Sequence, residues 1–180
     1  MARKNKKTLR LQSDHQWRAK PSHQIFVADQ GAVRFDIPER WIVIPEPDSV
    51  KLYDKQPPAD DCVLAVSYLR LPPMDWSGLP LTMLLNKATE STEREVTALE
   101  KPVELRRADL ECAWREMRFI DPKEQREAIS YLCLGRRKLI QCLITFDFWV
   151  TDRAKCNAVW NVVLETLTLA EFIRDPTTGL

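Results

Sequence analysis

A strict alternation of side chains over residues 138–150 constrains the fold more than any other feature of the sequence. One alternate set is wholly apolar and consists of Ile140, Cys142, Ile144, Phe146 and Phe148. The other set is mixed and consists of Leu139, Gln141, Leu143, Thr145, Asp147 and Trp149. Because successive side chains of a β-strand point to opposite faces, the pattern predicts a strand with one face packed against another layer.

Further strand-like segments precede this run, at residues 103–107, 110–120 and 126–134. Gly135 to Arg137 is predicted to form the hairpin turn before the last strand. A helix is expected after Val150, with Thr151 and Asp152 as its cap. Its apolar stripe, predicted to cover the apolar sheet face, consists of Cys156, Val159, Trp160, Val163, Leu164 and Leu167.

The first half of the chain predicts shorter elements. Short extended segments are expected at residues 25–27, 32–37, 41–44, 50–54 and 62–71. The last of these is nearly all apolar, which predicts a central strand covered on both faces. A helix follows the irregular 71–80 loop, with Asp75 or Ser77 as its cap. Its apolar face consists of Leu81, Leu84, Leu85 and Ala88, and residues 92–95 extend it to solvent.

This order of elements predicts the α+β class, with one antiparallel sheet of about six to seven strands flanked by two main helices. A chain of 180 residues suits one domain. We place that domain at residues 23–172. Residues 1–22 are predicted to be a basic, disordered arm, and residues 173–180 a frayed tail.

The segment from Gly31 to Trp41 resembles the "G-x-x-x-F-x-I-P-x-x-W" opening of the Mog/PsbP/DcrB-like superfamily, and the order of elements up to Leu169 is similar too. The resemblance implies a scaffold with non-catalytic roles. Members include a Ran-binding import factor, an extrinsic photosynthetic subunit, periplasmic lipoproteins and homodimeric cytosolic effector chaperones. The chaperones are closest in character. No functional residue transfers one by one, and the basic arm and the proline-rich loop at 72–80 depart from the family.

Charge is distributed unevenly along the chain. Residues 1–20 contain seven Lys or Arg and one acid, whereas the rest contains 20 Lys or Arg and 25 acids. Such an arm can bind phosphate without sequence specificity, can mediate self-association, or can simply keep the chain in solution. The residues predicted to contact nucleic acid are Arg3, Lys4, Lys6, Lys7 and Arg10.

Other features argue for a cytoplasmic protein without a membrane role. No run approaches the roughly 20 apolar residues that span a bilayer. No apolar segment follows the basic N-terminus, so a signal peptide is not predicted, and an organellar transit peptide is the alternative. The cysteines form no C-x-x-C pair, and we expect buried reduced thiols with no metal and no cofactor. They are Cys62, Cys112, Cys133, Cys142 and Cys156.

Five residues are candidates for contact with a protein partner. Met74 and Trp76 lie among prolines, where exposed Met and Trp are typical of interfaces, although Trp76 could instead pack into the core. Trp114 could line a sheet face or pack in the core. Arg136 and Arg137 form either an ordinary charged turn or a contact for an acidic partner at the expected hairpin tip.

Asp147 is the remaining candidate, because it interrupts an apolar strand. We expect an ion pair with Arg115 or Arg118, or an exposed edge position; a ligand-binding carboxylate is the alternative. No catalytic motif is recognisable, and no catalytic residue is assigned. The sequence therefore favours a non-catalytic adaptor or chaperone that binds a protein partner, with homodimerisation left open. A nucleic-acid-associated protein that uses the arm, and an enzyme with a site near Asp147, are the alternatives.

Overall fold

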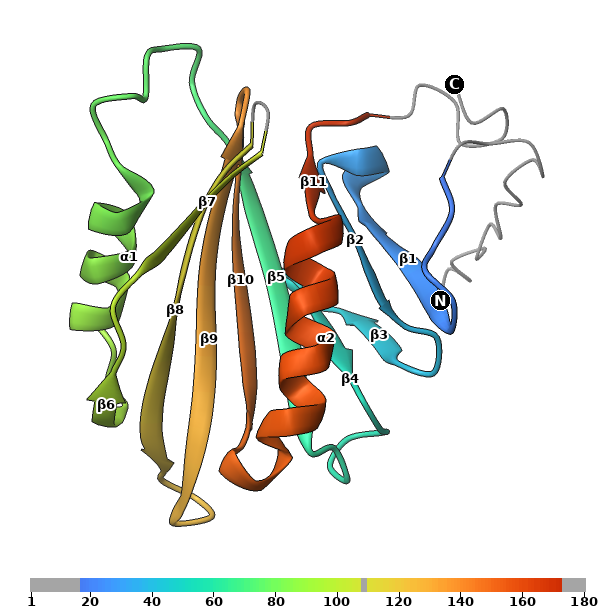
Figure 1. Cartoon of the computed structure of the whole chain (residues 1–180), viewed down its shortest axis with the longest axis vertical. Coiled ribbons are helices and arrows are strands. Elements are labelled where there is room, and N and C mark those ends of the chain that lie inside the picture. The colour runs from blue at the N-terminus through green and yellow to red at the C-terminus, as the bar shows by residue number, and fades with distance from the viewer. Residues whose placement is uncertain (1–16, 108–109, 173–180) are drawn as a thin grey trace, which may run out of the picture.

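The computed structural model describes residues 17–107 and 110–172 of the chain. Over these ranges the chain is α+β with two α-helices, as predicted (Figure 1). The strands form an eight-stranded and a three-stranded antiparallel sheet in place of the predicted single sheet of about six to seven strands. The helices are α1 (Leu81–Glu90) and α2 (Arg153–Thr166). The strands are β1 (His23–Ala28), β2 (Val33–Pro38), β3 (Ile42–Pro45), β4 (Val50–Tyr53), β5 (Cys62–Arg70), β6 (Glu95–Leu99), β7 (Val103–Arg107), β8 (Leu110–Asp121), β9 (Arg126–Arg137), β10 (Ile140–Trp149) and β11 (Thr168–Leu169).

The larger sheet has eight strands in the order β3-β4-β5-β10-β9-β8-β6, and β7 pairs beside β6 on the same edge of β8. The long strands β8, β9 and β10 form its centre. The alternation over residues 138–150 belongs to β10, and its five apolar side chains are all buried, as predicted. This sheet therefore carries both the predicted core and the surfaces described below.

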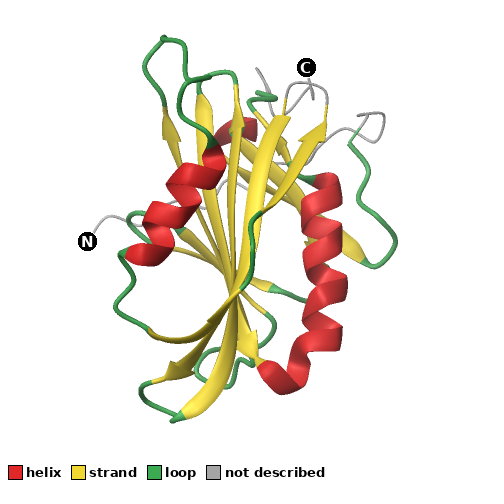
Figure 2. Ribbon diagram, turned by 60° about the vertical axis from the view of Figure 1, so that its left-hand side comes forward, coloured by secondary structure: helices red, strands yellow, loops and turns green. Residues whose placement is uncertain are grey.

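The two helices lie on opposite faces of the large sheet (Figure 2). We call the face covered by α2 the inner face. There Trp160 packs among aromatic rings, with ring centroids 5.3 Å from Tyr131, 5.8 Å from Trp114 and 6.2 Å from Phe146. The predicted role of the second helix is confirmed, since its apolar stripe covers the wholly apolar face of β10.

The opposite, outer face is covered only in part, by α1. Leu81 and Leu85 of α1 are buried against apolar side chains of β8 and β9, including Met117 and Leu132. The outer side chains of β5 and β10 remain half-buried. The prediction that residues 62–71 are covered on both faces is therefore wrong. This strand is central in the sheet order, but only its inner side chains are buried.

The smaller sheet joins the two ends of the domain, in the order β1-β2-β11. Val33 of β2 pairs with Leu169 of β11. The predicted turn between the first two strands is present at Asp29–Gly31. Gly31 has a φ of +107°, and a Cβ there would collide with the carbonyl oxygen of Glu171. Only glycine fits this close approach without strain.

Several local predictions are wrong. Gly135 lies inside β9, and the chain reverses at Lys138, whose φ of 52° supplies the turn. Asp152 occupies the N-cap position of α2 as predicted and Pro80 that of α1, but neither helix has a side-chain hydrogen bond at its cap. The carboxylate of Asp75 instead accepts a hydrogen bond from the backbone N–H of Ser77, at 2.9 Å. Residue 95, expected to end a helix, begins β6, an exposed strand with little hydrophobic pattern.

Contacts with the domain extend to residues that the sequence assigns to the arm. The Arg34 guanidinium lies 4.3 Å from the Trp17 ring centroid, and the backbone N–H of Lys20 donates to Asp36 at 2.8 Å. Order therefore reaches further toward the N-terminus than residue 23. The residues of the predicted nucleic-acid arm (Arg3, Lys4, Lys6, Lys7 and Arg10) and the predicted tail at 173–180 lie outside the described residues. Among the described helices, none has the length and apolar character needed to cross a bilayer.

Candidate protein-binding surface

The uncovered part of the outer sheet face forms a ribbon two strands wide, which we call the outer strip. It consists of Val63, Ala65, Ser67 and Leu69 of β5 and Gln141, Leu143, Thr145 and Asp147 of β10. The antiparallel register sets Ala65 opposite Thr145, so apolar and polar side chains alternate across the ribbon. None of these eight side chains is fully buried. The strip therefore presents half-exposed apolar surface next to α1.

A pocket of about 430 Å³ lies at the end of the strip that contains Asp147. Its lining residues come from β5, β8, β9 and β10 and from the loops at residues 60–61, 94 and 122. The Asp147 carboxylate accepts hydrogen bonds from Arg94, at 2.6 Å, and from the Ser130 hydroxyl, at 2.5 Å. Arg94 also lies over the Phe119 ring, 4.3 Å from its centroid. The carboxylate therefore has a charged and a neutral donor.

The predicted partners of Asp147 are wrong. Arg115 is buried under α1, where it donates to the Thr89 hydroxyl at 3.0 Å and to the Glu100 carbonyl at 3.1 Å. Arg118 pairs with Glu116 at 3.1 Å. The expected kind of interaction, a structural ion pair, is present, but its cation comes from the segment after α1. Sequence periodicity carries no signal for a contact made by an irregular segment.

The 72–80 loop lies at the opposite end of the strip. Met74 is 61% exposed, and two further exposed apolar side chains lie close by in the fold, Leu69 at 50% and Leu139 at 43%. Trp76 is half-exposed, and its indole N–H donates to the Pro72 carbonyl at 3.0 Å. Sequence reasoning missed Leu69 and Leu139. The alternation over residues 138–150 already placed Leu139 in the mixed set, whereas the nearly all-apolar run at 62–71 gave no such signal for Leu69.

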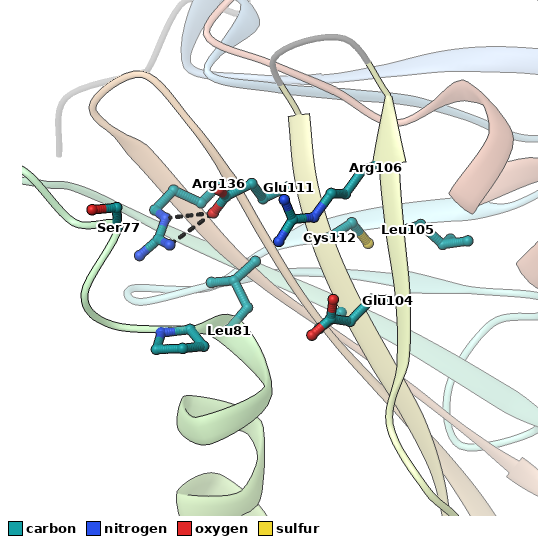
Figure 3. Close-up of a pocket in the computed structure, with 10 residues that line it drawn as sticks. Ser77, Leu81, Glu104, Leu105, Arg106, Glu111, Cys112 and Arg136 are labelled. Atoms are coloured by element: carbon teal, nitrogen blue, oxygen red, sulfur yellow. Dashed lines mark hydrogen bonds and ion pairs between the residues drawn. The ribbon is translucent and has the colours of Figure 1, made fainter.

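Arg136 fixes this loop to the sheet (Figure 3). Its guanidinium is bonded to the Glu111 carboxylate at 2.7 Å and donates to the Leu79 carbonyl at 3.1 Å. Because Arg136 is only 6% exposed and lies within β9, its assignment to an exposed hairpin tip is wrong. Its outward direction in the strand places it beneath the loop, where it also lines a cavity of about 90 Å³ with Glu104 and Arg106.

The structure brings four of the five predicted partner-binding residues together. Met74, Trp76, Arg136 and Arg137 line one pocket of about 260 Å³. Arg137 is half-buried and donates to the Leu169 carbonyl at 2.7 Å, so it also holds the C-terminal segment. Trp114 is not part of this group. It lies on the inner face, within the aromatic core.

The five cysteines are all buried, as predicted. The Cys112 and Cys133 sulfur atoms lie 3.3 Å apart. Burial raises the pKa of Cys142 to about 12, and a hydrogen bond with Cys156, together with burial, raises the pKa of Cys62. The Cys62 and Cys142 thiols are therefore poor candidates for nucleophiles, because the thiolate is the reactive form. Within the described residues, no group of three or more metal-binding side chains converges.

Comparison with known proteins identifies a close relative and a family. The model of the Alr1449 family matches residues 24–173. The protein alr1449 of Nostoc sp. is 45% identical over 176 residues, which cover 97% of this chain and 92% of the Nostoc protein. The match therefore extends over the whole folded domain.

Solved structures share the fold at low sequence identity. The PsbP protein of the cyanobacterium Synechocystis has a TM-score of 0.56 at 12% identity, over 82% of this chain and 92% of that one. The Ran-binding protein Mog1p of Saccharomyces cerevisiae has a TM-score of 0.52 at 9% identity, over 84% and 98%. A Bacteroides thetaiotaomicron protein has a TM-score of 0.60 at 14% identity, and the match spans 83% of this chain but about half, 49%, of that protein. The predicted Mog/PsbP-like fold is confirmed.

Proposed function

This chain belongs to the Alr1449 family, and on that premise we propose that it is a non-catalytic, cytoplasmic protein-binding domain of the adaptor or chaperone type. The observation that carries the proposal is the outer strip, a half-exposed part of the sheet between α1 and the β3 edge. Antiparallel sheets often leave a mixed face to solvent, but half-exposed apolar side chains gathered on one such face favour an interaction surface.

The composition of the strip suits an extended protein segment. Its apolar side chains alternate with hydroxyl and amide groups, so a partner can bury apolar surface and still satisfy its own polar groups. Met74 at one end adds a flexible, exposed side chain of a kind that adapts to different partners. The likeness to the yeast Ran-binding protein agrees with this proposal, because that protein uses the same fold in an interaction with a protein.

The pocket at the Asp147 end of the outer strip supports the same proposal. Arg94 and Ser130 hold the Asp147 carboxylate, which favours a structural role over that of a proton donor or acceptor. We therefore assign the pocket to the binding surface, as the place where the partner's segment ends.

The basic arm supports a second candidate function, association with nucleic acid. Seven Lys or Arg within 20 residues form a charge density that binds phosphate backbones. On this proposal, binding to a random-sequence duplex falls steeply as salt rises, and deletion of residues 1–20 abolishes it. Equal binding by the full and truncated chains would contradict the role of the arm.

Site-specific photo-crosslinking in the host cell tests the leading function. A photoreactive amino acid replaces Ser67 or Thr145 of the outer strip, one position at a time. Asn161, exposed on α2 at the opposite face, is the matched control position. We expect one shared crosslinked protein from both strip positions and none of that species from Asn161.

Two outcomes would contradict the proposal. Identical products from all three positions would indicate that the strip has no special role. An absence of any protein adduct at positions 67 and 145, with the variants expressed and folded by circular dichroism, would indicate that the strip faces only solvent.

A further inference from the structure

The edges of the large sheet differ in how they are protected against pairing. Strand β3, at one edge, ends in Pro45, which removes a backbone donor. Strand β6, on the other edge, has a register shift between Val96 and Ala98. Bulges and prolines are two protections of edge strands, beside short length and charged side chains. Strand β7 has neither a bulge nor a proline, and it pairs with β8 in one unbroken register from Val103 to Arg107.

The free edge of β7 therefore presents a regular row of backbone groups. Among the described strands, β8 is its single neighbour. Exposed, regular edge strands are templates for pairing with another strand. Val103, at the start of β7, is also 44% exposed, so apolar surface lies beside the edge.

Two of the three charged residues of β7 lie symmetrically about its central residue, and the third, Arg107, donates to the Glu165 and Leu167 carbonyls. Glu104 and Arg106 flank Leu105 and point to the outer side, whereas Leu105 points to the inner side and packs on the core (Figure 3). Within the described part of the chain, no hydrogen bond or ion pair engages the side chain of Glu104 or Arg106. Glu111, directly across from Arg106 on β8, is already bonded to Arg136.

We propose that β7 pairs antiparallel with β7 of a second copy of this chain, about a twofold axis at Leu105. In that register Glu104 of each copy lies opposite Arg106 of the other. Opposite charges directly across an antiparallel pair stabilise it, and both pairs form on the same face. The two large sheets then continue as one through the dimer.

The charge order favours a second copy over an unrelated strand. A twofold axis at Leu105 relates two antiparallel copies of β7. It sets the acid of each copy opposite the base of the other, so the strand is complementary to a second copy of itself. The inference goes beyond the proposed function, because the outer strip lies on other strands and remains open in the dimer.

Sedimentation velocity of the full chain, over about 1–100 µM, tests the proposal. We expect a concentration-dependent dimer. The variants Glu104→Arg and Arg106→Glu place like charges opposite each other, and each is expected to weaken self-association about tenfold or more. The control Lys123→Glu, at the distant β8–β9 turn, makes the same size of charge change and is expected to leave the dimer unchanged.

Two charge-complement measurements make the test specific to the register. The double variant with Glu104→Arg and Arg106→Glu restores both opposite-charge pairs and is expected to restore the dimer. A mixture of the two single variants is expected to form a heterodimer, since one copy then offers two bases and the other two acids. Both measurements substitute only the exposed residues Glu104 and Arg106. Circular dichroism confirms that each variant is folded.

The outcomes separate cleanly. A monomer over the whole concentration range would overturn the proposal. A dimer that both single variants leave intact would place the interface elsewhere and would also overturn it. Weak association in the double variant and in the mixture, with folded chains, would exclude the twofold register at Leu105.

Discussion

The two faces of the large sheet are built differently, although the same strands supply both. The inner face is wholly apolar along β10, and α2 covers it with a cluster of large rings around Trp160. The outer face mixes polar and apolar side chains, and the shorter α1 packs against β8 and β9. We infer that the inner face supplies most of the stability, which leaves the outer face free to present a binding surface.

The largest effect is expected where the inner face is most densely packed. Trp160→Ala removes a buried side chain that contacts three other rings, and it leaves a cavity. We expect a loss of about 3–5 kcal/mol in the free energy of unfolding, measured by urea denaturation. Trp160→Phe is the control, because it keeps an aromatic ring and removes an indole N–H that has no partner among the described residues. An equal loss in the two variants would contradict the packing argument.

A smaller effect is expected from acid, again on the inner side. Burial raises the pKa of Asp54, but its bonds to Lys155 and to the backbone N–H groups of Asp61 and Cys62 outweigh burial and leave the pKa lowered. Burial likewise raises the pKa of Glu116, and its bonds to Arg153 and Arg118 again give a net lowering. Lys155 and Arg153 belong to the first turn of α2, so both carboxylates anchor that helix.

The sign of the pH effect follows from these directions. A carboxyl group with a lowered pKa in the folded state stabilises the fold above its unfolded pKa, and this contribution is lost as pH falls through the folded value. We expect the free energy of unfolding to fall as pH drops below about 4.5, where these carboxyl groups begin to be protonated in the unfolded chain. Asp54→Asn with Glu116→Gln should flatten that part of the pH profile. An unchanged slope in the double variant would assign acid sensitivity to other groups.

A truncation on the outer face is expected to cost less than one on the inner face. Leu143 of β10 is half-buried and packs at the margin of the α1 cluster. Leu143→Ala should lower the free energy of unfolding by about 1 kcal/mol, since partly exposed sites lose less surface and leave no closed cavity. A loss as large as that of Trp160→Ala would mean that both faces contribute equally to stability. That result would contradict the inferred difference between the inner and outer faces.

The smallest effect on stability is expected at Thr145. Thr145→Arg adds a charge to the outer strip, where solvent can reach the side chain. The free energy of unfolding should change by less than about 0.5 kcal/mol, while capture of the partner identified by crosslinking is lost. Retained binding by a folded variant would remove Thr145 from the interface.

The sequence predicted the parts of the fold that have a strong period. Strand β10, its inner residues and the helix α2 follow from alternation or from a 3–4 spacing of apolar residues. Strand β6 was missed because it is short, largely exposed and at an edge. Neither of its faces is buried, so its sequence has no alternating apolar pattern. Gly135 was assigned to a turn because glycine usually marks one. In the fold, Gly135 lies inside β9, and glycine suits that position because a Cβ there would lie 3.0 Å from the Cys142 sulfur.

The candidate site could be predicted only in part. Exposure of Met74 follows from its proline-rich surroundings, and four of the five proposed residues do lie together. The burial of Arg136 and the pairing of Asp147 with Arg94 depend on where two irregular segments return to the sheet. Such contacts have no period in the sequence, and they appear only once the strands and helices are assembled.

The pairing of β2 with β11 has a consequence for how a cell makes this protein. Arg34 and Thr168, which are bonded across this pair, are 134 positions apart. During translation, at about 5–20 residues per second, the first strands wait on the order of ten seconds for their last neighbour. The buried side of β2 also lacks α2 for nearly all of that interval. The apolar side chains of the newly made N-terminal segment thus stay exposed until α2 and β11 have been synthesised, and the domain is expected to close only after that.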